Sequence, residues 1–504
     1  MSIVPRVKRI FLEIDNLYKK KQAKCAFFVL FIAAVFLDIN NENVFRRFLT
    51  TREFTGDENK YMRMVQSLAA DGDLDLSNLW FEKGEMREVW KKILSSESRQ
   101  FGDFYFLAVN GGIYALHMPG VAFLLLPAYK LDSIVFPNDP KSSPVGLPFL
   151  PRKLLFTFLW LAALMTLNFG LLFRLTDHLF KSAFLAVLIF FFLIYHSPFP
   201  TYSFTVFPGC SAAFFFLLAL NCILFPFRMR KINDCLLVLG TVFLPWLHQR
   251  FIPLSGGLFL AFVINNKGYG SSRKRLLLVS LALIVLSLPY FYYFYSLTGN
   301  PSPFSTSEYF GRVHFSPKVI PLGFFGLLFS PSQGSIWRYR WMILFFFGMY
   351  WAFKKDKKVT SSLLVPALLY YLVCAGSTIL GGGASPPGRF LLPLFPIFLI
   401  FVGFVFQDLL KQFSYSKLAF YVVFLSLFFF SKRMLLFHFA DRYAKPPFYN
   451  YIFTEPVDLG WIIESVAIIS MIFLLIFLSD RFLFARKRIM GKKKNSAQRS
   501  SPSG

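Results

Sequence analysis

Long apolar stretches recur along most of this chain, and they constrain its fold more than any other feature. A helix that crosses a bilayer needs about 20 mostly apolar residues. Stretches of about this size lie at 24–39, 154–173, 182–197, 204–227, 235–250, 251–265, 276–296, 338–353, 360–380, 389–407, 417–431 and 459–480. Apolar residues form 55% of the chain, above the share of about 45–50% usual in soluble domains. We therefore predict an all-α polytopic membrane protein with about 12 transmembrane helices, of which the two near residue 250 are alternatively one bent re-entrant unit.

Basic residues occupy every second connection between these stretches. With the N-terminus in the cytoplasm, the inward connections are 174–181, 227–231, 267–275, 354–358 and 411–417, and all of them are rich in Lys and Arg. Retention of basic loops on the cytoplasmic side explains this pattern. It also explains the net charge of +27 without a nucleic-acid partner. The predicted organisation is a basic cytoplasmic N-terminus (1–23), a transmembrane domain (24–480) with external loops at 40–153 and 297–338, and a basic cytoplasmic tail (481–504).

The apolar run 113–136 does not fit this alternation as a transmembrane helix. If it crossed the bilayer, every later basic loop would lie outside. We therefore predict a helix lying along the outer membrane surface, and we treat the shorter run 319–329 in the same way.

A polar segment, residues 40–112, interrupts the apolar chain after its first long stretch. It holds 12 of the 27 acidic residues and ten basic ones, so its net charge is about −2, whereas the remainder of the chain carries about +29. Asp57 and Glu58 stand just before a predicted amphipathic helix, 59–70, whose apolar face repeats at helical spacing. At this position Asp57 and Glu58 are candidate catalytic acids just outside the membrane. The alternative is that they only cap the helix, since acids favour a first turn.

Three further sites carry charged or ionisable side chains at the external ends of apolar stretches. His117 precedes Pro119 and Gly120 at the start of the predicted surface helix, where a structural role is the alternative. His248 and Arg250 lie within a long apolar stretch, where charge is costly and usually functional, although an arginine there can also extend to the interface. Arg389 is predicted to be the first residue of a helix that follows a glycine-rich turn. An arginine and the amides of a helix start can bind an anion there. The alternative is that the arginine only reaches the membrane interface. We take His117, His248, Arg250 and Arg389 as candidate substrate-binding residues.

No metal-binding or nucleotide-binding motif is visible. The run from Asp71 to Asp75 lacks the glycine and the distal glutamate of a calcium loop, so we predict a turn. We assign no metal ligands and no certain cofactor, and a divalent metal at Asp57 stays open.

In order along the chain, these motifs resemble those of the GT-C glycosyltransferases. The resemblance rests on residues 56–58 with Tyr61, on 71–76, on 117–120, on 245–250 and on 385–390, and it extends over about residues 1–410. Among GT-C enzymes the chain is similar to the dolichyl-phosphate-mannose protein mannosyltransferases and to the lipid A aminoarabinose transferase. It departs from them at Asn59, Lys60 and Met118.

The resemblance implies a transferase that moves a sugar from a polyprenyl-phosphate carrier to a lipid, glycan or protein on the external face of the membrane. It implies that Asp57 is the functional acid and that Arg250 and Arg389 contact the donor phosphate. The expected location is the bacterial inner membrane, with the site facing the periplasm. Two other classes remain: a flippase for lipid-linked sugars, which also needs phosphate-binding cations, and a non-catalytic envelope scaffold.

Overall fold

The computed structural model describes residues 57–77, 100–101, 105–137, 151–195, 197–199, 202, 205–266, 272–305, 315–329, 334–377 and 388–411. Its long helices are α8 (Leu155–Phe180), α9 (Ala183–Tyr195), α11 (Pro208–Leu224), α12 (Arg230–Leu247), α13 (Ile252–Asn266), α14 (Ser272–Thr298), α18 (Leu344–Lys355), α19 (Lys357–Ala375) and α20 (Phe395–Lys411). The expected first helix at 24–39, the expected helices at 417–431 and 459–480, and both basic termini lie outside the described residues.

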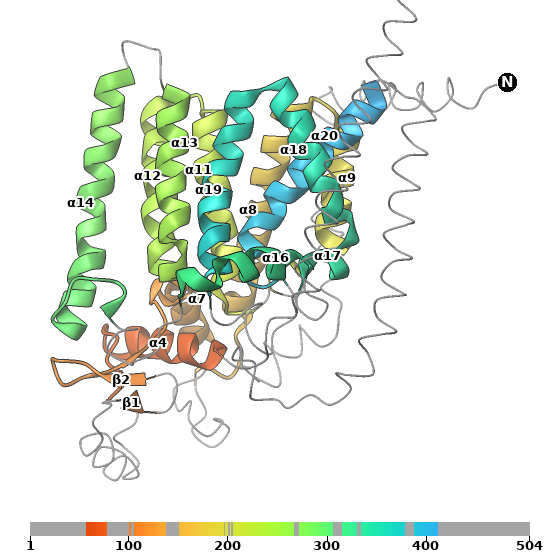
Figure 1. Cartoon of the computed structure of the whole chain (residues 1–504). Coiled ribbons are helices and arrows are strands. Elements are labelled where there is room, and N and C mark those ends of the chain that lie inside the picture. Colours follow the sequence, from red (N-terminus) through yellow and green to blue (C-terminus); the bar gives the residue numbers. More distant parts are fainter. Residues whose placement is uncertain are drawn as a thin grey trace, which may run out of the picture.

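These long helices run side by side as one bundle (Figure 1). Among the described residues, four of them are long and apolar enough to cross a membrane: those over Leu155–Phe180, Arg273–Thr298, Lys357–Ala375 and Leu392–Leu410. On α14 only 11% of the apolar window is buried, and Leu277 and Ile284 are more than 60% exposed. Apolar side chains exposed along a whole helix are stable against lipid and costly in water.

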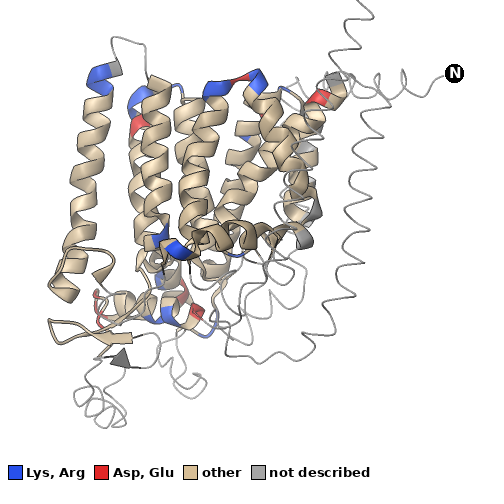
Figure 2. Ribbon diagram, in the orientation of Figure 1, with Lys and Arg blue, Asp and Glu red and all other residues tan. Residues whose placement is uncertain are grey.

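The two ends of the bundle differ in composition. Lys and Arg gather at one end (Figure 2), which we call the basic end; it comprises Lys181, Arg228, Arg230, Lys231, Arg273, Lys274 and residues 354–358. The opposite end, called here the loop end, carries α4 (Glu58–Ala70), α7 (Gly120–Val135) and α16 (Ile320–Phe329) (Figure 1). The separation of basic connections from the larger loops agrees with the predicted alternation.

Each helix at the loop end lies across the bundle rather than within it (Figure 1). In α4 the predicted apolar face is buried, with Tyr61, Met64, Val65 and Leu68 at most 7% exposed. Helix α7 packs against α4 and against the start of α8, where Asp132 accepts from the Phe156 and Thr157 amides at 2.7 and 2.8 Å. Helices are therefore present at both positions where surface helices were predicted, as α7 and α16.

Two details of this end differ from prediction. The surface helix begins at Gly120 and not at residue 113, because Ile113–Ala115 forms strand β3 of a small antiparallel sheet. Its partners are β2 (Tyr105–Leu107) and β1 (Gln100–Phe101), in the order β1-β2-β3. Strands of two or three residues leave too little alternation to be recognised in a sequence.

The pair of stretches near residue 250 forms two separate helices, α12 and α13, and not one re-entrant unit. Helix α12 ends at Leu247, the short 3-10 helix η2 (Gln249–Phe251) turns the chain, and α13 starts at Ile252. This turn joins the two helices at the loop end of the bundle (Figure 1).

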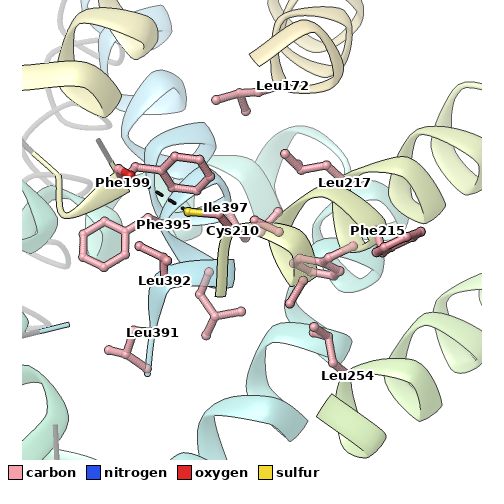
Figure 3. Packing of buried hydrophobic residues seen from close by; sticks show 14 of the residues in the cluster. Leu172, Phe199, Cys210, Phe215, Leu217, Leu254, Leu391, Leu392, Phe395 and Ile397 are labelled. Carbon is pink, nitrogen blue, oxygen red and sulfur yellow. Dashed lines mark hydrogen bonds between the residues drawn. The ribbon is translucent and has the colours of Figure 1, made fainter. Parts of the chain in front are cut away.

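The core of the bundle is made by α8, α11, α13 and α20, and Figure 3 shows part of its packing around Cys210 and Phe215. Glycines allow some of the helices to approach closely. At Gly257 of α13, for example, a β-carbon would overlap Pro366 of α19. The segment that leads into α20, with Leu391, Leu392 and Phe395, is anchored in the same core.

Candidate active site at the loop end

Asp57 lies at the N-terminus of α4 and points its carboxylate at three nitrogen atoms. Arg389 Nη2 donates to Oδ2 at 2.9 Å, and Lys60 Nζ donates to Oδ1 at 3.2 Å. His117 Nε2 is 3.5 Å from the same Oδ1. Asp57 is the N-cap residue of α4 but makes no side-chain capping bond. The capping alternative is therefore wrong for its side chain, which instead joins segments that lie 332 positions apart.

The ionisation of Asp57 and His117 follows from these contacts. Burial raises the pKa of Asp57, but the hydrogen bonds and charges of His117 and Arg389 outweigh burial and hold the pKa well below its ordinary value. Burial lowers the pKa of His117 below 6.5, although Asp57 opposes this shift. At neutral pH, Asp57 is an anion and His117 is mainly a neutral imidazole.

The side chain of Glu58 has different surroundings from that of Asp57. It is 0% exposed, and its Oε1 accepts from the Val206 amide at 2.8 Å. It is not part of the pocket that Asp57 lines. Asp57 and Glu58 were predicted together as catalytic acids, and for Glu58 this placement is a correction. Adjacent residues at a helix start point about 100° apart, and only Asp57 reaches the pocket.

Arg250 is held by an aromatic ring and by a histidine. Its guanidinium carbon is 4.2 Å from the centre of the Phe390 ring, and Nη2 is 2.8 Å from His248 Nε2. His248 Nδ1 also lies 3.2 Å from the Arg250 amide. A neutral imidazole has one acceptor nitrogen, and the shorter contact to the cationic group is the stronger one. Arg250 Nε is buried without a protein partner among the described residues, so this arginine does not simply extend to the interface.

Burial lowers the pKa of His248 well below 6.5, and the charge of Arg250 lowers it further. The histidine is therefore neutral and able to accept from Arg250, which fixes the guanidinium against Phe390.

Arg389 does not open a helix, contrary to prediction. Gly388 has a φ of +88°, which only glycine adopts without strain, and α20 begins at Phe395 after the 3-10 helix η6 (Leu392–Leu394). Pro393 lacks an amide hydrogen, so it permits this irregular entry. The Arg389 guanidinium packs 4.1 Å from the centre of the Phe207 ring while it binds Asp57. Arg389 is therefore an ion-paired residue of the site, and not one that merely extends to the interface.

These side chains line one pocket. Each predicted site residue except Glu58 belongs to it, and its other lining residues are Tyr61, Tyr202, Phe207, Pro208, Gly209, Phe251, Tyr370, Phe390, Leu392 and Pro393. Sequence reasoning missed the tyrosines and Phe390 as site residues. Tyr61 was grouped with the apolar face of its helix, and Tyr370 is one of many aromatics in a chain with 22 Tyr and 68 Phe.

The carboxylates of this end do not form a metal site among the described residues. Asp57 is held by nitrogen donors. Asp73 and Asp75 accept from backbone amides of their own turn, at 2.9 Å each, as the predicted turn requires. The residues around Asp57 thus supply cations where a divalent metal needs oxygen ligands.

Comparison with known proteins finds solved structures with a similar fold. No protein-family model and no curated protein matches the chain. Among solved structures, ArnT from Cupriavidus metallidurans bound to undecaprenyl phosphate aligns with a TM-score of 0.50 and 13% identity, over 81% of this chain and 64% of that one. Apo ArnT from the same organism aligns with a TM-score of 0.47 and 15% identity, over 76% of this chain and 59% of that one. The chain spans less than two thirds of each ArnT chain.

The bundle and this similarity define the class: the chain is an all-α polytopic membrane protein. Its fold is similar to that of ArnT. The fold predicted from the resemblance is therefore confirmed.

Proposed function

We propose that this protein is a glycosyltransferase that moves a sugar from a polyprenyl-phosphate carrier to an acceptor at the external face of the membrane. The observation that carries the proposal is the pocket at the loop end, which is lined by the Asp57 carboxylate and by two arginines, Arg250 and Arg389. The predicted topology puts this end outside the cytoplasm. For a bacterial chain, it would face the periplasm from the inner membrane.

The two arginines suit a phosphate that loses its sugar. A polyprenyl-phosphate sugar is a phosphodiester with one negative charge, and the departing polyprenyl phosphate gains a second. Fixed cations therefore stabilise the transition state more than the bound donor. Arg250 and Arg389 each stack on an aromatic ring, at 4.2 and 4.1 Å, which holds their planar donors in place. The ArnT structure with undecaprenyl phosphate supports this class of carrier.

Asp57 has the position of a general base. An acceptor hydroxyl or amine attacks the anomeric carbon, the bond from that carbon to the phosphate oxygen breaks, and Asp57 takes the acceptor's proton. The phosphate keeps the bonding electron pair. Direct displacement of this kind inverts the configuration of the sugar. A positioned base contributes about 10²–10⁴-fold to the rate.

The Asp57–Arg389 contact makes Asp57 a weak base before the donor binds, because its pKa is lowered. A donor phosphate near Arg250 competes with Asp57 for the Arg389 guanidinium. As Arg389 turns toward the phosphate, the carboxylate loses a charge partner and becomes more basic. Donor binding thus activates the base, and Asp57 abstracts a proton only when a leaving group is present.

A flippase is the main rival, since it also needs phosphate-binding cations. It would need charge along the transport path, whereas the charged side chains of the described helices gather toward the two ends of the bundle (Figure 2). Two substitutions separate the functions. Asp57→Asn and Arg250→Ala both abolish sugar transfer by a transferase; a flippase loses carrier movement mainly with Arg250→Ala, and a scaffold is unaffected by either. Sugar transfer that persists in Asp57→Asn would reject the proposal.

A further inference from the structure

One hydroxyl in the pocket has no role in the mechanism above. Tyr61 lines the pocket and is 1% exposed. It follows Asp57 by four residues, so both side chains project from the same face of α4. Its ring meets the His117 ring edge-on, with centroids 5.1 Å apart and an interplanar angle of 76°. The Tyr61 ring therefore packs against His117 and lines the same pocket as Asp57.

The charges around Tyr61 are those that surround the proposed phosphate position. Asp57, Arg250 and Arg389 all act on its hydroxyl electrostatically. The Asp57 carboxylate accepts from Arg389 at Oδ2 and from Lys60 at Oδ1. Among the described residues, no side chain or carbonyl accepts a hydrogen bond from the Tyr61 hydroxyl. The Tyr370 hydroxyl, by contrast, donates a hydrogen bond to the Phe390 carbonyl at 2.6 Å.

A buried tyrosine hydroxyl normally has a partner, because leaving it unpaired costs free energy. We infer that the Tyr61 hydroxyl donates a hydrogen bond to the phosphate of the lipid-linked donor, as a third contact beside Arg250 and Arg389. This inference rests on the proposed function, since it deepens the donor site. A phosphate oxygen is the suitable acceptor, because the two guanidinium groups draw an anion and not a neutral sugar hydroxyl to this place.

The protonation state of Tyr61 agrees with a donor role. Burial raises the pKa of Tyr61 and the charge of Asp57 raises it further, against the opposing effect of the two arginines. The phenol is therefore protonated throughout the physiological range, and it supplies a hydrogen without adding a charge.

The test is the affinity of the full-length protein for undecaprenyl phosphate, measured by titration in lipid nanodiscs without acceptor. Tyr61→Phe removes only the hydroxyl, and Tyr105→Phe is the matched control, because Tyr105 is a mostly buried tyrosine of β2 outside the pocket. We expect Tyr61→Phe to bind undecaprenyl phosphate about tenfold more weakly or worse, with Tyr105→Phe close to wild type. Undecaprenol, which lacks the phosphate, should bind both variants and the wild type equally.

Equal affinity of wild type and Tyr61→Phe for undecaprenyl phosphate would overturn the inference, as would an equal loss of undecaprenol binding. Thermal unfolding of each variant shows whether the fold is kept. Should Tyr61→Phe unfold, proton–phosphorus NMR of undecaprenyl phosphate bound to ¹⁵N-labelled wild type decides, because ¹⁵N coupling distinguishes arginine N–H protons from a tyrosine hydroxyl proton. A correlation between ³¹P and a tyrosine hydroxyl proton supports the contact, and its absence contradicts it. These titrations measure binding alone and do not depend on sugar transfer. If the protein bound undecaprenyl phosphate through Tyr61 but transferred no sugar in a separate assay, the proposed function would be contradicted and the tyrosine contact would stand.

Discussion

Asp57 carries its charge among donors that favour the ionised form. Arg389, Lys60 and His117 face its carboxylate, and the Tyr61 ring lies beside His117. Because the pKa of Asp57 is lower in the folded protein than in the unfolded chain, ionised Asp57 stabilises the fold above about pH 4. That stabilisation is lost only as the pH falls through the lowered pKa.

Arg389→Gln should change the pH dependence of transfer. Removal of the guanidinium takes away one of the two groups that lower the pKa of Asp57, while burial and His117 remain, so the pKa rises toward its ordinary value. The rate should then fall on acidification at a higher pH than in wild type. The measurement is the pH profile of kcat/KM for the donor, because this ratio reports the free enzyme, in which Arg389 still pairs with Asp57. Arg250→Gln is the control, since Arg250 does not contact Asp57: it should weaken donor binding without moving the acid limb. Identical acid limbs for Arg389→Gln and wild type would contradict this role.

Individual residues of the site differ in how far the sequence reveals them. Asp57, Arg250 and Arg389 were recognisable because charge next to apolar stretches is costly. Their mutual contacts were not, because a pair 332 positions apart leaves no local pattern. Tyr61 was hidden for a different reason: its ring satisfies the apolar periodicity of the helix, and only the structure shows where its hydroxyl points.

At the scale of elements, helix contacts set the shape of the pocket. Helix α13, which follows Arg250, packs along α19, which supplies Tyr370. Two adjacent glycines of α13 differ in this contact: a β-carbon at Gly257 would lie 2.8 Å from Pro366 Cβ, whereas one at Gly256 would meet nothing within 4 Å.

These glycines make a matched pair for a stability measurement. Gly257→Ala should lower the thermal unfolding midpoint, because α13 and α19 must separate and such overpacking costs about 1–3 kcal/mol. Gly256→Ala should leave the midpoint unchanged or raise it, since alanine favours a helix by up to about 1 kcal/mol. Both variants compared in one detergent test the packing, and equal midpoints would show that α13 does not pack on α19 as described.

Elements with strong periodicity were predictable and irregular ones were not. The amphipathic helix at 59–70 begins one residue earlier than predicted, at Glu58. The late start of α20 and the three short strands followed from local backbone geometry that hydropathy does not report. The irregular segments hold His117, His248 and Arg389, because irregular chain at the bundle end leaves side chains free to converge on a ligand.

For the whole molecule, the proposed function requires that the basic end of the bundle face the cytoplasm. Basic residues at one end and the pocket at the other predict an external pocket. This orientation is testable without any substrate.

Cysteine labelling in intact cells reads the orientation directly. In a background without native cysteines, Asp73→Cys places a thiol at the loop end and Lys357→Cys places one at the basic end; both native residues are exposed. A membrane-impermeant maleimide should label position 73 in intact cells and position 357 only after the membrane is opened. Labelling of position 357 in intact cells would invert the topology and put the pocket in the cytoplasm.

The central claim is that Asp57 acts as the base in sugar transfer from a polyprenyl-phosphate donor. Its most direct test is transfer in reconstituted vesicles, with a panel of labelled polyprenyl-phosphate sugars and envelope extract as the acceptor. We predict that wild type moves label into an acceptor from at least one donor, and that Asp57→Asn lowers this rate by about 10²-fold or more while it still binds undecaprenyl phosphate. Label that crosses the bilayer without reaching an acceptor, equally in wild type and Asp57→Asn, would contradict the account.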